Sequence, residues 1–352
     1  MFTRVQRPTA GFRGRSLLRS LVLPLATAAV LASGVTACSS DGSGSGSAAA
    51  AGAPSTAGAR DAAFPVSIPT KFGDVTVKQK PTRVVALGWG DAETALALGV
   101  QPVGASDWLA FGGDGVGPWA KGRYQKKPEI IGTLEPEYEK IAALRPDLIL
   151  DTKSSGDQKR YDNLSKIAPT VDVPKGGDQY KTTWDVQTRM VADALGLKAE
   201  GARLVAAAKE KFAKAAAAHP EFHGRTITVG ALSGAGYGAY VSGVDRVDFV
   251  QRLGFRNNPA IEKRAGAAFS VSVSRENLNL LDADVLLMTH IGVPASKITG
   301  DRLYRELPAV KAGHSVVMDD QNVSQAFATD SVLSMDYALS KVVPLLAKAL
   351  AR

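Results

Sequence analysis

Aromatic residues gather at two points where buried strands of this chain are expected to end. Trp89 follows the apolar run at 83–88, and Trp108 opens a glycine-rich segment, SDWLAFGGDGVGPWAKGRY, after the next short strand. Long loops of this kind are usually functional. Aromatic walls with a few hydrogen-bond donors suit the binding of a bulky small molecule. Trp119 is expected only to pack the loop against its lobe. The predicted ligand contacts here are Trp89, Trp108, Phe111, Arg123 and Tyr124.

Further candidates follow the other expected strands, because open α/β sheets bind ligands at the carboxyl ends of their strands. In the first half of the chain these are the segment KSSGDQ (153–158) and Tyr180. Arg264, like Arg123, is a cation that could meet an anionic or carbonyl-rich ligand. In the second half the predicted contacts are Tyr237, Tyr240, Phe269, His290 and Phe327.

The same residues argue against a metal centre or an enzyme. The four histidines are scattered, and no His/Cys/Asp cluster has metal-ligand spacing, which disfavours a bare zinc or manganese site. The glycines of VGALSGAGYGAY lack the G-x-G-x-x-G spacing of a dinucleotide site, and no G-x-S-x-G nucleophile motif occurs. We therefore predict a binding protein with no catalytic residue, no metal and no cofactor.

The start of the chain contains its only cysteine, Cys38, behind an arginine-bearing segment and the apolar run LLRSLVLPLATAAVLASG. This order is typical of a secretory signal. The residues VTAC (35–38) resemble the lipobox of bacterial lipoproteins, in which the cysteine sulfur receives a diacylglycerol and the new amino terminus is acylated. We expect a lipoprotein signal peptide at 1–37 and a flexible Gly/Ser/Ala tether at 38–63. The alternative is a chance cysteine near an ordinary cleavage site.

Charge does not indicate a nucleic-acid partner. Of the formal charge of +8, five units come from arginines within 1–37, which leaves +3 on the rest of the chain. Nucleic-acid binding needs basic residues concentrated on one face. We expect a monomer that meets the membrane only through its lipid, outside the cytoplasm.

The elements that must position these residues alternate between apolar strands and amphipathic helices. RVVALG precedes DAETALALG, and LILDT precedes QKRYDNLSKIAPTVDVP, so mostly parallel sheets covered by helices are expected. The fold class is α/β, with lobes at 64–183 and 220–352 around a ligand cleft. The helical stretch at 184–219 joins them, as one bent helix or as two, because Gly196 and Gly201 interrupt it.

Five segments in order resemble the solute-binding proteins of iron-siderophore ABC importers, a family that also includes ferric citrate, haem and vitamin B12 binders. They are RVVALGWGDAETALALGVQPVGAS, PEIIGTLEPEYEKIAALRPDLIL, YDNLSKIAPTV, VSRENLNLLDADVLL and LPAVKAGHSVVMDD. The resemblance spans about residues 65–350. It implies two Rossmann-like lobes bridged by a long helix, little closure, and delivery of a ferric siderophore to a permease.

The resemblance also implies two docking residues. In similar proteins one acidic residue on each lobe meets arginines of the ABC transporter permease. The matching positions are Glu139 in EKIAALRPD and Glu276 in VSRENL, and the neighbouring Glu135 and Glu137 could share the first role. Charge pairing of this kind contributes orientation and association rate more than affinity.

The ligand implied is an iron(III) chelate whose six oxygens already satisfy the metal, so the protein need supply no metal ligand. Several aromatic residues with few arginines favour a hydroxamate siderophore over strongly anionic catecholates or ferric citrate. Haem, ferric citrate and cobalamin remain alternatives within the same fold. A surface lipoprotein without a transport role is a more distant one.

Overall fold

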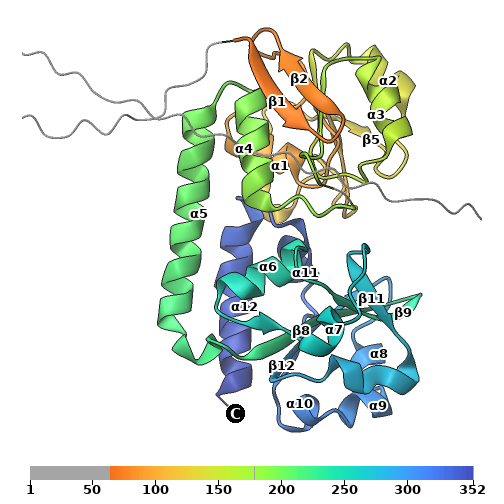
Figure 1. The fold of residues 1–352 in the computed structure, drawn as a ribbon, viewed down its shortest axis with the longest axis vertical. Helices are drawn as coiled ribbons and strands as arrows, with labels where there is room; N and C mark the ends of the chain where they lie inside the picture. The colour runs from red at the N-terminus through yellow and green to blue at the C-terminus, as the bar shows by residue number, and fades with distance from the viewer. Residues whose placement is uncertain (1–63, 178, 352) are drawn as a thin grey trace, which may run out of the picture. The chain divides into compact units, whose positions relative to one another are not determined.

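The computed structural model describes residues 64–177 and 179–351, all within one compact unit. Cys38, the expected signal peptide and the expected tether lie outside the described residues. Two α/β lobes are visible in Figure 1, the first in orange to yellow-green and the second in teal to blue. Among the residues described, no helix combines the length and apolar character needed to cross a membrane.

The first lobe is built on a parallel five-stranded sheet in the order β5-β4-β3-β6-β7. Its strands are short, and most are buried on both faces, which explains their nearly continuous Val, Ile, Leu and Ala. An antiparallel hairpin, β1-β2, lies beside it. The strands are β1 (Val66–Thr70), β2 (Gly73–Val77), β3 (Val84–Ala86), β4 (Gly104–Ser106), β5 (Glu129–Ile131), β6 (Leu148–Asp151) and β7 (Thr170–Asp172).

Short helices connect the strands of the first lobe. Because each crossover returns to a parallel strand, the helices lie against the faces of the sheet. They are α1 (Asp91–Ala97), the 3₁₀ helix η1 (Pro118–Ala120), α2 (Tyr138–Ala143) and α3 (Gln158–Ser165).

The connection between the lobes consists of two helices, α4 (Trp184–Ala194) and α5 (Lys198–Ala218). Gly196 has a φ of 72°, a left-handed conformation that ends α4. Gly201 lies inside α5, where a Cβ atom would be 2.3 Å from the Cβ of Ala192. The two glycines therefore have different roles, because one breaks the helix and the other lets α4 and α5 pack closely. Only α5 runs from one lobe to the other (Figure 1).

The second lobe has a mixed sheet in the order β11-β9-β8-β12-β13, with β10 also paired to β8. Strands β8, β12 and β13 are parallel, whereas β9 pairs antiparallel with both β8 and β11. The strands are β8 (Thr226–Ser233), β9 (Gly236–Tyr240), β10 (Arg256–Asn257), β11 (Ser270–Val273), β12 (Val285–Ile291) and β13 (Ser315–Val317).

Two helices, α11 and α12, lie at the end of the second lobe. Helix α11 (Gln321–Thr329) ends at Asp330, whose φ of 48° is left-handed. Helix α12 (Ser334–Leu350) follows and packs beside α5. The other helices of this half are η2 (Pro220–Phe222), α6 (Asp245–Arg252), α7 (Pro259–Glu262), η3 (Arg275–Leu281), α8 (Ser296–Thr299), α9 (Arg302–Arg305) and α10 (Pro308–Lys311).

Candidate ligand-binding site

Two adjoining cavities lie where the strand ends of the two lobes face each other. They share Trp89, Trp108, Arg246, Ile291 and Ala328. We call the smaller one, of about 310 Å³, the aromatic chamber, and the larger one, of about 590 Å³, the polar chamber. The aromatic chamber is further lined by Leu134, Tyr180, Tyr240, Val244, Asp245 and Phe269. The polar chamber is further lined by residues that include Leu109, Thr289, His290, Gln321, Ser324 and Gln325.

Two stacked tryptophans form the first-lobe wall of the aromatic chamber. Trp89 follows β3 and Trp108 follows the adjacent strand β4, so the parallel register brings both indoles to one sheet edge. Their ring centroids are 5.7 Å apart and their planes differ by 2°. The Nε1–H of Trp108 donates to the carbonyl of Leu87 at 2.8 Å, and Tyr180 meets its ring edge-on at 5.5 Å. The wall is therefore held before any ligand binds.

Apolar side chains, most of them from the second lobe, line the rest of the aromatic chamber. Tyr240 at the end of β9 and Phe269 just before β11 lie with centroids 6.4 Å apart. Leu134, Ile291 and Phe269 are 70%, 51% and 43% exposed, and each lines the aromatic chamber. Leu345 is the one other large hydrophobic side chain exposed in the described part of the chain. Concentrated apolar exposure of this kind marks a binding surface rather than a solvated one.

Arg246 is the cation of the cleft. It lies in the first turn of α6, with its guanidinium carbon 4.7 Å from the ring centroid of Tyr240 and 5.6 Å from that of Trp89. Such stacking orients a guanidinium while leaving its N–H donors for other partners. Its buried Nε–H has no hydrogen-bond partner among the residues described. An oxygen-rich ligand is the kind of partner that these donors suit.

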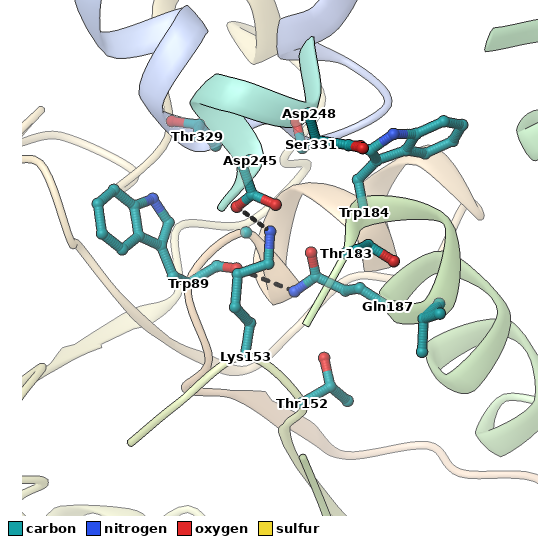
Figure 2. A network of polar contacts seen from close by, with 12 residues as sticks. Trp89, Thr152, Lys153, Thr183, Trp184, Gln187, Asp245, Asp248, Thr329 and Ser331 are labelled. Atoms are coloured by element: carbon teal, nitrogen blue, oxygen red, sulfur yellow. Dashed lines mark hydrogen bonds and ion pairs between the residues drawn. The ribbon is translucent and has the colours of Figure 1, made fainter. Parts of the chain in front are cut away.

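A buried ion pair crosses from one lobe to the other next to Arg246. Lys153, which follows β6, is 1% exposed, and its Nζ lies 2.6 Å from Oδ2 of Asp245, the first residue of α6 (Figure 2). Burial raises the pKa of the Asp245 carboxyl, although the Lys153 charge opposes that shift. Since Asp245 precedes Arg246, this pair fixes the turn that presents the guanidinium.

A second buried carboxylate, Asp91, supports the Trp89 loop. Its Oδ2 accepts from the backbone N–H groups of Gly88 at 3.1 Å and Thr152 at 2.9 Å. Its Oδ1 accepts from the Thr152 hydroxyl and from Nε2 of Gln187 on α4, at 2.7 Å. Nε2 of Gln187 also donates to the Trp89 carbonyl at 2.9 Å (Figure 2). Burial raises the pKa of Asp91 to about 6.

Two further polar contacts join the lobes. Glu93 on α1 accepts from Nε1 of Trp119 at 2.8 Å and from the hydroxyl of Ser331, which follows α11. Burial raises the pKa of Glu93, and these hydrogen bonds oppose the shift. Nε2 of Gln325 donates to the Leu109 carbonyl at 2.9 Å. Trp119 thus packs its loop against the rest of the protein, and also contacts Tyr337 of α12 at 5.8 Å.

Six of the residues predicted from the sequence come together at the two chambers. Five of them lie at or after the end of a strand, as the strand-end argument expects, whereas Phe269 lies just before β11. They are Trp89, Trp108, Tyr180, Tyr240, Phe269 and His290.

Several other predicted contacts lie elsewhere. Phe327 is fully buried in the second-lobe core, 5.1 Å from Phe249, because it lies on the inward face of α11. Tyr124 is also a core residue, and burial raises the pKa of its phenol. Arg123 and Arg264 are exposed and line neither chamber. The cation that lines the chambers is instead Arg246.

Two more predicted aromatic contacts also lie outside the chambers. The hydroxyl of Tyr237 donates to Asp301 at 3.3 Å in a separate groove of the second lobe. Phe111 packs edge-on against Trp119 at 5.5 Å and lines only a narrow space beside the cleft. Tyr237 and Tyr240 are three residues apart in β9, so their side chains point to opposite faces of that strand.

The sequence analysis missed Arg246, Leu134 and Ile291. A usable signal for Arg246 was present, since VDRVDF begins a helix directly after the strand that ends at Tyr240. Leu134 and Ile291 gave no signal, because an exposed aliphatic residue resembles a core residue until the fold is known.

The side chain of His290, in the polar chamber, is hydrogen-bonded to the backbone. Nδ1 of His290 lies 2.7 Å from the carbonyl of Val293 and donates to it, while Nε2 lies 3.6 Å from a carboxylate oxygen of Asp319. Within the described ranges, no group of three or more His, Cys, Asp or Glu side chains is arranged to hold a metal ion. His290 is thus available to contact a ligand but is not part of a metal cluster.

The predicted docking glutamates are exposed, one on each lobe. Glu139 lies in the first turn of α2, and Glu276 in the first turn of η3. The pKa of Glu276 is lowered by its own backbone N–H and by the Ser274 hydroxyl. Glu137 is instead paired with Lys140 at 2.8 Å. The Glu139 carboxylate makes no ion pair with another residue that the structure describes, so it is better placed than Glu137 to meet another protein.

The two-lobe fold with an aromatic cleft defines a solute-binding protein. The match to the family described as periplasmic binding protein spans residues 84–322, and the chain belongs to this family. The prediction of a binding protein rather than an enzyme is thereby confirmed.

Individual relatives agree with that assignment. The chain is 28% identical over 258 residues to the Bacillus subtilis (strain 168) protein named "Probable siderophore-binding lipoprotein YfiY", covering 69% of this chain and 77% of that one. It is 29% identical over 161 residues to the Fe(3+) dicitrate-binding periplasmic protein FecB of Escherichia coli (strain K12), covering 45% and 52%. The structure of PiaA from Streptococcus pneumoniae TIGR4 in complex with ferrichrome aligns at 26% identity with a TM-score of 0.70, covering 81% and 99%.

Proposed function

We propose that this protein captures a ferric siderophore in the cleft and delivers it to the permease of an ABC importer. The observation that carries the proposal is the aromatic chamber, where stacked tryptophans, three exposed apolar side chains and one arginine converge. A coordinatively saturated iron chelate has an apolar periphery and an oxygen-rich face, and both would find partners there. The names of YfiY and of the PiaA complex support this ligand class.

A hydroxamate chelate fits the charge of the cleft better than ferric citrate does. Arg246 and Asp245 are the charged residues that line the aromatic chamber, and Asp245 is already paired with Lys153. One arginine is sufficient for a ligand with little or no negative charge, whereas a multiply anionic complex needs several cations. The relationship to FecB keeps ferric citrate as the second candidate.

Arg246→Leu tests the proposed site. We expect a ferric trihydroxamate to quench the fluorescence of the stacked Trp89 and Trp108 in the wild type. Loss of a charged hydrogen-bond donor should weaken binding by about 10- to 100-fold. Arg264→Leu is the matched control, because that arginine is exposed outside both chambers.

The titration has clear opposing outcomes. Tight binding of ferric citrate, haem or cobalamin, with no response to ferric hydroxamates, would replace the hydroxamate proposal. Equal effects of the Arg246 and Arg264 substitutions would show that the ligand does not lie in the aromatic chamber.

We propose that Glu139 and Glu276 dock the two lobes onto the permease. The double variant Glu139→Ala/Glu276→Ala should abolish iron-chelate uptake by cells while leaving chelate affinity unchanged, since neither residue lines a chamber. Glu210→Ala, which removes an exposed glutamate of α5, is the control and should retain uptake. Retained uptake in the double variant would place the docking surface elsewhere.

We further propose that Cys38 is lipidated and that the mature protein is a monomer held at the outer face of a membrane. The VTAC motif and the lipoprotein name of YfiY support the anchor. Cys38→Ser should release the protein into the medium. Retention of that variant at the membrane would contradict lipidation at this residue.

A further inference from the structure

One wall of the polar chamber is a helix face that carries polar side chains, which the iron core of a chelate would not require as partners. Gln321, Ser324, Gln325 and Ala328 of α11 all line it. Their i, i+3, i+4, i+7 spacing places them on one face of the helix. The opposite face, including Phe327, is buried in the second-lobe core. Helix α11 therefore presents a stripe of uncharged polar side chains to the cleft.

The side chains of this stripe are available for hydrogen bonds. Gln321 and Ser324 make no side-chain hydrogen bond to another residue that the structure describes. Gln325 uses one amide N–H on the Leu109 carbonyl, which fixes the amide and leaves its carbonyl oxygen as an acceptor. The side chain of Asp320 accepts from the N–H groups of Asn322 at 2.9 Å and Val323 at 3.2 Å, so the start of the helix is also fixed.

The chemistry of the chamber selects an uncharged occupant. Arg246, at the boundary with the aromatic chamber, is the one permanently charged side chain among the lining residues. The chamber of about 590 Å³ is larger than the aromatic chamber of about 310 Å³, so a ligand that filled only the latter would leave most of the cleft empty. Amide and hydroxyl groups of a ligand pair well with glutamine and serine side chains.

We propose that the polar chamber is a subsite for a neutral, amide- or hydroxyl-bearing arm of the chelate, whose iron core lies in the aromatic chamber. The inference rests on the proposed function and deepens it. Arg246, Trp89 and Trp108 line both chambers, so they stand where the core and the arm of one ligand would join. The stripe on α11 is thus a determinant of which chelate is preferred.

Two ferric trihydroxamates test this proposal, one a macrocycle without a side arm and one linear with an arm that ends in an acetamide. Affinities are measured by tryptophan quenching. The wild type should bind the linear chelate about tenfold more tightly, the effect of one or two net hydrogen bonds. Gln321→Ala/Ser324→Ala should remove that preference and leave the affinity for the macrocycle within about twofold. Asn322→Ala, an exposed neighbour on α11 that does not line the chamber, should keep the preference.

The outcomes separate this inference from the function on which it rests. If the macrocycle binds but the arm makes no difference, or if the double variant weakens both chelates equally, the subsite is refuted and the proposed function stands. If neither chelate binds the wild type, the hydroxamate function itself is refuted, and the subsite with it.

Discussion

The Asp330→Asn variant should become increasingly more stable than the wild type as the pH rises above 4. Asp330 is 1% exposed, and neither carboxylate oxygen has a hydrogen-bond partner in the described part of the chain. Lys153 is already 2.6 Å from Asp245 and compensates that charge. A second carboxylate beside Asp245 would be uncompensated, so burial first, and then the Asp245 charge, raise the pKa of Asp330 well above its usual range.

The size of the effect follows from proton linkage. A carboxyl whose folded-state pKa is raised contributes stability below its unfolded pKa of about 4 and loses that contribution as the pH rises to the folded pKa. The loss approaches about 1.4 kcal/mol for each pH unit over which the folded protein keeps the Asp330 proton and the unfolded chain does not. Asparagine carries no charge and tolerates the left-handed backbone at this position, where φ is 48°.

The assay is urea unfolding of the wild type and Asp330→Asn at several pH values from 4 to 7. The free energy of unfolding of the variant should rise relative to that of the wild type by the slope given above. An unpaired amide N–H adds an offset that does not depend on pH, so the slope carries the test. Asp162→Asn on α3 controls for the loss of an exposed carboxyl. A difference between Asp330→Asn and wild type that stays constant from pH 4 to pH 6 would refute the reasoning.

Three other substitutions test the ion pair between the lobes and the placement of the two phenylalanines. Lys153→Met leaves Asp245 buried without its cation and should lower the free energy of unfolding by about 3–5 kcal/mol in urea titrations; a loss below about 1 kcal/mol would mean that the pair is not buried as described. Phe327→Ala should cost about 3–5 kcal/mol by opening a core cavity, whereas Phe269→Ala, at a partly exposed position, should leave stability nearly unchanged and weaken chelate binding. Thermal unfolding and fluorescence titration of both variants check this, and the reverse pattern would contradict it.

The sequence was sufficient for the α/β class, the two lobes and the residues that directly follow parallel strands. Trp89 and Trp108 were found because a strand end determines its position in a parallel sheet without knowledge of the other lobe. His290, near the end of the parallel strand β12, was found in the same way, whereas Tyr240 ends β9, which pairs antiparallel with its neighbours. Strand ends can be predicted from the residue pattern of a short segment alone.

The failures have a common physical cause, which is that helix rotation and loop paths depend on tertiary contacts. Phe327 and Ala328 are neighbours, yet one faces the core and the other the cleft. The sequence analysis did not identify helix α11, and therefore missed its face toward the cleft. Arg246 was missed because it opens a helix, whereas the search for cations followed the aromatic loop. Gly196 and Gly201 looked alike in sequence, but Gly196 ends α4 with a left-handed backbone, whereas Gly201 allows α4 to pack on α5.

The polar contacts between the described parts of the two lobes affect how loaded and unloaded protein share the transporter. These contacts join Lys153 to Asp245, Glu93 to Ser331 and Gln325 to Leu109. If they hold the lobes in one arrangement, the empty and the loaded protein present Glu139 and Glu276 at nearly the same spacing. Unloaded molecules would then compete with loaded ones for each permease. Cells that overproduce this protein at scarce chelate should import iron more slowly, and the ratio of binding protein to transporter becomes a quantity that the cell must limit.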